Sequence, residues 1–91
     1  MEVRFFANFI DITGSSTCQV DGPHTVYSLV EALCLRFGEP MARLLLNEQG
    51  EPLHEDLFVL VNGRHIRQLN GLQTELAPTD VISIVPVIEA G

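Results

Sequence analysis

The segment that most constrains the fold is residues 26–37, the longest stretch of the chain whose apolar residues recur at helical spacing. Thr25 is a predicted N-cap for it, and Gly38 stands where a helix favours a left-handed stop. The apolar positions on one face are Val26, Leu29, Val30, Leu33 and Phe37. A helix with one apolar face must cover another element, so the rest of the chain should supply a sheet.

The flanking segments predict strands, because they are short runs rich in β-branched and aromatic residues and are bounded by turn residues. Asn62-Gly63 is typical of a tight hairpin turn between two of them. A short helical turn is predicted over residues 41–46, after Pro40. The five predicted strands are residues 2–10, 16–21, 57–61, 64–67 and 81–85. The first and last strands are the most apolar, so we expect them at the centre of the sheet.

The predicted order is two strands, the main helix and three more strands, which indicates an α+β domain with the helix packed across one face of a mixed sheet. This pattern matches the ubiquitin-like β-grasp, in which the first and last strands lie parallel and side by side. A chain of 91 residues suffices for one such domain. We expect the β-grasp domain to span residues 1–86 and a flexible C-terminal tail to span residues 87–91.

The chain is acidic, with a formal net charge of −7 from 5 basic and 12 acidic side chains. Such a surface repels phosphate backbones, so the charge argues against nucleic acid and favours a basic protein surface as partner. Every basic residue is arginine, so there is no side-chain amine for isopeptide attachment. No apolar run approaches the ~18 residues of a membrane span, and the start does not resemble a signal peptide. We therefore expect a cytoplasmic protein without membrane contact.

The residue types that often catalyse reactions or bind metals are scattered along the chain. His24, His54 and His65 lack metal-ligand spacing, so no metal site is predicted. Cys18 and Cys34 lie in different predicted elements, and we expect two buried free thiols in a reducing compartment. No Ser-His-Asp, Cys-His or paired-carboxylate arrangement is evident, so we expect no stand-alone active site.

Phe6 is the residue of the first predicted strand whose position is unusual for a monomer. Alternate residues of a strand share a face. The helix-covered face is expected to hold Val3, Phe5, Ala7 and Phe9. Phe6 then falls on the other face, with Arg4 and Asn8. It either belongs to a minor second cluster or anchors a partner subunit, and we favour the anchor.

Seven short stretches, in this order and spacing, resemble the small subunit of molybdopterin synthase and its relative, the thiamine sulfur carrier. The resemblance extends over nearly the whole chain. The stretches are residues 3–7 (VRFFA), 12–14 (ITG), 25–26 (TV), 61–64 (VNGR), 69–72 (LNGL), 79–81 (TDV) and 84–91 (IVPVIEAG).

The resemblance implies a carrier, or the small subunit of a molybdopterin synthase-type complex. In that family the C-terminal glycine, here Gly91, is adenylylated by an E1-like activating enzyme and converted to a thiocarboxylate. The carrier then gives its sulfur to a substrate held by the large subunit of molybdopterin synthase, in molybdenum cofactor biosynthesis. The expected partners are therefore the E1-like adenylyltransferase and that large subunit. ATP and magnesium would be used by the activating partner, and this chain would bind no cofactor.

The family's tail usually reads Pro-Pro-Val-Ala-Gly-Gly, and this chain keeps part of that pattern. Pro86 matches the first proline, Gly91 matches the terminal glycine, and Ala90 replaces the penultimate glycine. Val85 replaces the aromatic residue that precedes the prolines, whereas Phe6 keeps a partner-facing aromatic of the first strand. The predicted partner-binding residues are Phe6, Val85, Pro86, Val87, Ile88, Glu89 and Ala90.

Two other functions remain open on the sequence. The replacement at Ala90 is compatible with a non-transferring β-grasp subunit or regulator of a larger enzyme. A carrier for another sulfur pathway, such as thiamine synthesis, would share the same tail chemistry, because the accepting subunit decides the product.

Overall fold

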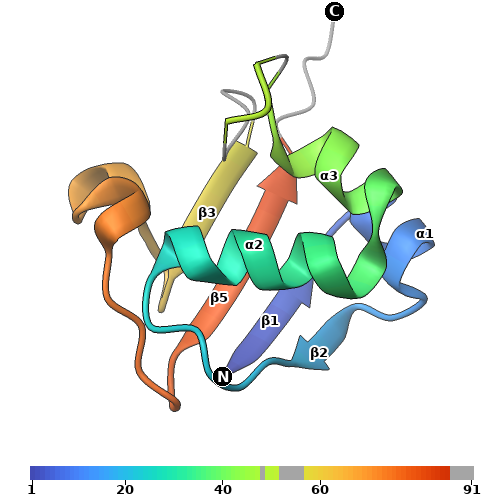
Figure 1. Ribbon diagram of the computed structural model, residues 1–91. Coiled ribbons are helices and arrows are strands. Elements are labelled where there is room, and N and C mark those ends of the chain that lie inside the picture. The colour runs from blue at the N-terminus through green and yellow to red at the C-terminus, as the bar shows by residue number, and fades with distance from the viewer. Residues whose placement is uncertain (48, 52–56, 87–91) are drawn as a thin grey trace, which may run out of the picture.

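The structure is a computed structural model that describes residues 1–47, 49–51 and 57–86. Its helices lie on one side of a five-stranded sheet (Figure 1). The strands are β1 (Glu2–Phe5), β2 (Thr17–Gln19), β3 (Leu57–Val61), β4 (Arg64–His65) and β5 (Val81–Pro86). The helices are α1 (Asn8–Thr13), α2 (Val26–Phe37) and α3 (Glu39–Leu45), with short 3-10 turns η1 (Ile66–Gln68) and η2 (Gly71–Gln73).

The sheet has the order β2-β1-β5-β3-β4, so β5 is its central strand. β1 pairs with β5 in parallel, with Val3 opposite Ile82, and the other three pairings are antiparallel. The predicted parallel neighbours, the first and last strands, are confirmed. A mixed sheet with one main helix across one face is the predicted ubiquitin-like β-grasp.

The main helix begins and ends where the sequence predicts. The Thr25 hydroxyl accepts a hydrogen bond from the Ser28 N–H, and the Ser28 hydroxyl accepts one from the Thr25 N–H, which closes a capping box. Gly38 ends the helix with a φ of 79°. The buried residues of α2 are Val26, Leu29, Val30 and Leu33. They pack onto the inner residues of the sheet, which include Val3, Phe5, Val59, Ile82 and Ile84.

The predicted first strand, residues 2–10, is wrong beyond Phe5. Ala7 has a φ of 55°, a left-handed value that strand geometry excludes, and α1 begins at Asn8. Phe9 is buried as predicted, but it reaches the core from α1, where its ring stacks on that of Phe5 at 6.4 Å. Ala7, predicted to face the core, is exposed. The gain from packing the two aromatic rings outweighs the local strand preference of these residues.

Other boundaries differ by a few residues. The second strand is shorter than predicted, and the fourth stops at His65 because Ile66 turns inward as part of η1. The predicted helical turn at residues 41–46 is α3, which begins earlier with Pro40 in its first turn, where the missing N–H has no helical partner to lose.

Cys18 and Cys34 are both free, as predicted, but they are half-buried rather than buried. Burial raises the pKa of both thiols, and the nearby Arg36 partly offsets this for the pKa of Cys18. Within the described residues, no helix is long and apolar enough to cross a membrane.

Candidate partner-binding site at the tail end of the sheet

The sheet brings three apolar residues to one level near the end of β5. Val85 of β5 lies opposite Phe58 of β3, and Phe5 of β1 lies opposite Ile84 of β5. Continuing this register by one residue places Phe6 at the level of Val85. Phe58 and Val85 therefore come from the neighbouring strands β3 and β5, and Phe6 directly follows the last residue of β1, although the sequence separates Phe6 from Val85 by almost the whole chain.

These side chains lie on the face of the sheet that α2 does not cover. The strand neighbours Val59 and Ile84 are buried under the helix, so the alternation along β3 and β5 turns Phe58 and Val85 to the open face. Phe6 follows the buried Phe5 directly and is exposed. Phe6 is 43% exposed and Phe58 is 42% exposed. The structure thus places Phe6 on the open face, as the sequence predicted.

A fourth apolar residue joins this end of the molecule from α1. Ile10 is exposed and comes one turn after Phe6, just beyond the end of β1. The four residues Phe6, Ile10, Phe58 and Val85 are called the tail-end surface below. Three of the five exposed large apolar side chains of the described residues belong to it.

Sequence reasoning missed Phe58 and Ile10. The run of β3 is apolar at every position, so no alternation marks Phe58 as the residue that points outward. Ile10 lay inside the strand predicted for residues 2–10, so its side chain was assigned to a face of the sheet and not to a helix. Recognising that a helix begins at Asn8 would have identified Ile10 as an exposed residue.

Polar groups of the described residues border the tail-end surface, and one buried ring nitrogen among them, the His65 Nε2, has no hydrogen-bond partner there. Arg4 and Glu2 form an ion pair on β1, with 2.6 Å between Nε and Oε2. The His65 ring meets that of Phe58 edge-on at 5.2 Å, and its Nδ1 accepts a hydrogen bond from the Arg67 N–H at 3.0 Å. An apolar centre with a polar border is typical of a protein-binding surface.

β5 ends at Pro86, which lies opposite Leu57 of β3 and has no N–H to donate to a further ladder bond. Pro86 therefore lies at the edge of the tail-end surface, directly after Val85. The other predicted site residues lie outside the described residues; they are Val87, Ile88, Glu89, Ala90 and Gly91.

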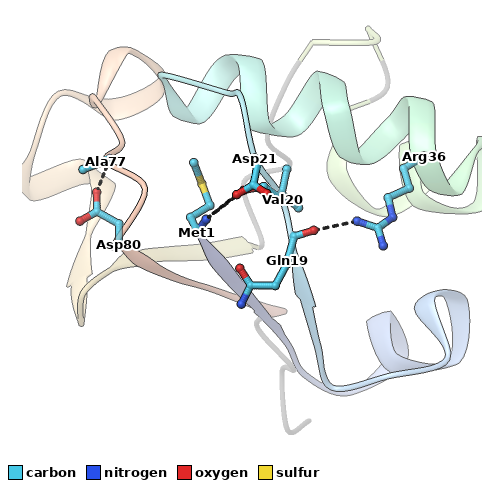
Figure 2. A network of polar contacts seen from close by, with 7 residues as sticks. All are labelled: Met1, Gln19, Val20, Asp21, Arg36, Ala77 and Asp80. Atoms are coloured by element: carbon cyan, nitrogen blue, oxygen red, sulfur yellow. Dashed lines mark hydrogen bonds and ion pairs between the residues drawn. The ribbon is translucent and has the colours of Figure 1, made fainter.

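The opposite end of the sheet carries a carboxylate with a structural task. Asp80 accepts hydrogen bonds from the Ala77 N–H at 2.7 Å (Figure 2) and from the Asn62 side chain at 2.9 Å. These two bonds lower the pKa of Asp80, with the Ala77 bond the larger cause. Among the described residues, no group of three or more His, Cys, Asp or Glu side chains could hold a metal ion.

Comparisons with known proteins bear on the whole chain. The model of the ThiS family matches residues 3–91. Small archaeal modifier protein 3 of Haloferax volcanii is 32% identical over 93 residues, which cover 100% of this chain and 98% of that protein.

Solved structures show the same fold. The small archaeal modifier protein 1 of Methanosarcina acetivorans has a TM-score of 0.82 and 28% identity, covering 99% of this chain and 94% of that chain. A chain in the crystal structure of the Amycolatopsis orientalis BexX/CysO complex has a TM-score of 0.81 and 26% identity, covering 99% of this chain and 98% of that chain.

Proposed function

The chain belongs to the ThiS family of ubiquitin-like sulfur carriers, and from this we propose that it carries sulfur as a thiocarboxylate on Gly91. The sulfur then passes to a molybdopterin precursor held by the large subunit of molybdopterin synthase. We place this chemistry in the cytoplasm, where ATP is supplied. The body of the protein has the task of binding each partner, and the tail has the task of presenting its last carbonyl carbon.

The observation that carries the proposal is the position of the tail-end surface. Phe58 pairs with Val85, Phe6 directly follows the residue that pairs with Ile84, and Val85 is followed directly by Pro86 and residues 87–91. Five residues span at most ~17 Å, which is enough to enter a partner's cavity while the body stays outside. A partner that binds the tail-end surface would therefore hold the body next to the entrance of its own active site.

The activation step would be carried out by an E1-like partner that binds ATP and magnesium. A carboxylate oxygen of Gly91 attacks the α-phosphorus of ATP, and pyrophosphate leaves. Hydrosulfide released by a sulfur donor then attacks the acyl carbon, the bond to AMP breaks, AMP leaves, the proton goes to solvent, and the thiocarboxylate remains. Glycine suits this position because it has no Cβ to keep the reacting carbon away from the partner.

Ala90 sets a requirement on the partners. One added methyl group in a tight channel commonly costs ~1–3 kcal/mol when there is no room for it. We therefore propose that the activating enzyme for this chain has space beside the penultimate residue. The variant Ala90→Gly should then be activated no better than the wild type by this enzyme.

A second candidate function is protein modification, because the curated relative from Haloferax volcanii is named a small archaeal modifier. The activated Gly91 would be the same in both cases. In a modifier, an amine of a target protein attacks the acyl carbon and forms an amide, whereas in a carrier a sulfur nucleophile does so.

The test is the intact mass of the full chain after incubation with ATP, magnesium, a sulfur donor and the cognate activating enzyme. We expect one sulfur-for-oxygen exchange. A chain shortened by Ala90 and Gly91 is the matched control, because it should bind the enzyme but show no exchange. No exchange in the full chain would overturn the proposal and favour a non-transferring subunit. Adding the large subunit with its precursor, or a lysine-bearing target protein, then separates the two fates of the acyl group.

A further inference from the structure

The chain has no lysine, and its five basic residues are all arginine: Arg4, Arg36, Arg43, Arg64 and Arg67. A guanidinium stays protonated at any ordinary pH and is not an acceptor for acyl groups. The 91 residues therefore hold no side-chain amine that an activated carboxyl group could acylate.

The α-amino group of Met1 is an amine, but the fold occupies it. It donates a hydrogen bond to the Val20 carbonyl at 3.0 Å and lies 3.5 Å from the Asp21 Oδ1 (Figure 2). The Val20 N–H donates in return to the Met1 carbonyl at 3.0 Å, so both main-chain groups of Met1 are tied to the end of β2. The Met1 side chain is only 3% exposed and belongs to the core.

An amine accepts an acyl group only after it loses a proton and turns its lone pair toward the acyl carbon. The contacts to Val20 and Asp21 hold the amine against these two oxygens, and the buried Met1 side chain prevents the amine from swinging out without loss of core packing. Because β1 and β5 are parallel, the amine also lies at the end of the sheet opposite Pro86. The tail of the same chain therefore begins one strand length away from the Met1 amine.

The fold does not itself require arginine at every one of these positions. Arg36 makes contacts suited to a guanidinium, since it donates to the Gln19 carbonyl at 2.9 Å and lies over the Phe37 ring at 5.3 Å. Arg43 is exposed and only pairs with Glu39 one helical turn away, a contact that lysine makes equally well. The packing of the fold therefore does not by itself explain why the chain has no lysine side chain.

We propose that the activated chain is a donor of its acyl group and never an acceptor, so that it is attached to an amine of a target only as a single, terminal unit. The inference rests on the proposed activation of Gly91. In the excluded reaction, the amine nitrogen of a second copy would bond to the acyl carbon, the bond to AMP would break, AMP would leave, and the amine proton would go to solvent.

The first test measures amine reactivity and does not depend on the activating enzyme. The chain, prepared so that it begins at Met1, is treated with N-hydroxysuccinimide acetate at neutral pH, and the intact mass is followed. Loss of two hydrogen-bond contacts is needed to expose the amine, so acetylation should be about tenfold slower than for the urea-unfolded chain. Equal rates in the folded and unfolded chain would overturn the proposal.

The second test measures self-conjugation. The chain is incubated with ATP and the activating enzyme, and hydroxylamine in a parallel sample traps the acyl group as proof of activation. Wild type should form no covalent dimer, and Arg43→Lys, which adds one exposed amine without changing the charge, should form one. Arg43→Gln is the matched control and should behave as wild type.

Amide-linked dimers of the wild type would overturn the proposal. Failure of the hydroxylamine trap in every sample would instead overturn the proposed function, and the acetylation rates would still decide the inference.

Discussion

Phe58 is held in place more firmly than a typical exposed side chain. Its ring meets the edge of His65, and His65 is in turn fixed by the hydrogen bond from the Arg67 N–H. An aromatic ring whose position is set before binding loses little entropy when a partner covers it. Phe58 is therefore the residue of the tail-end surface best suited to anchor a partner.

We predict that Phe58→Ala weakens binding to the activating enzyme by about tenfold or more, because truncation of a central aromatic anchor commonly costs ~2 kcal/mol. The variant should remain folded, since Phe58 lies outside the helix-covered core. The measurement is a calorimetric titration of the enzyme with the full chain. Leu35→Ala is the control, because Leu35 is 88% exposed on α2, away from the tail-end surface. Equal losses for both variants would contradict the assignment of the surface.

Asp80 predicts how stability depends on pH. Its hydrogen bonds from Ala77 and Asn62 favour the ionised carboxylate in the folded state, so its pKa lies below the unfolded value. A lowered pKa contributes stability above the unfolded pKa of about 3.9, and this stability is lost as the pH falls through the folded pKa. We predict that Asp80→Asn is less stable than wild type near neutral pH and that the difference shrinks below about pH 4. Urea midpoints across this range measure it, and a difference that stays constant with pH would refute it.

At the scale of the elements, the switch from β1 to α1 decides what the first strand contributes to the surface. Ala7 absorbs the change of direction with φ 55° and ψ −131°, and Gly14 ends α1 with a φ of 76°. Residues with a Cβ adopt such a positive φ only with strain. The strain is offset because the switch buries Phe9 against Phe5.

We predict that Ala7→Gly stabilises the protein by up to ~1 kcal/mol, since relief of a strain of ~1–2 kcal/mol exceeds the entropy that glycine adds to the unfolded chain. Ala77→Gly is the control. Ala77 is also an exposed alanine but has no positive φ, so this variant should be destabilised by roughly 0.5 kcal/mol. Urea unfolding of both variants measures the two effects, and a loss of stability in Ala7→Gly would show that the strain is absent.

At the scale of the whole molecule, acidity and apolar exposure serve different steps of binding. The net charge of −7 acts over distances of about 10 Å at moderate salt, before contact is made. The tail-end surface acts only at contact, where it determines how long the complex persists. Acidic side chains are spread over many elements, so they increase the association rate but do not fix the orientation in which the partner binds.

We predict that the association rate constant with the activating enzyme falls severalfold when salt is raised from about 0.05 M to about 0.5 M, whereas the dissociation rate constant changes little. Stopped-flow or surface binding kinetics would measure both constants. Asp11→Asn, on α1 beside the tail-end surface, should reduce this salt dependence more than Glu75→Gln, which is exposed beyond η2. A rate constant that is independent of salt would contradict electrostatic steering.

The sequence by itself determined the elements that depend on neighbours in the chain. The span of α2 follows from its apolar spacing, the Thr25 cap and Gly38, and the hairpin between β3 and β4 follows from Asn62-Gly63. These signals could be read directly because the hydrogen bonds and steric limits behind them act within a few residues. The position of Phe6 on the open face also followed from strand alternation.

The tertiary structure alone decided which distant residues meet. The length of β1 depends on the packing of Phe9 against Phe5, and the grouping of Phe6, Phe58 and Val85 depends on the register of three strands that are far apart in the sequence. The pairing of the Met1 amine with Val20 depends likewise on the register of β1 with β2. These contacts arise from long-range burial and pairing, for which local periodicity carries no signal.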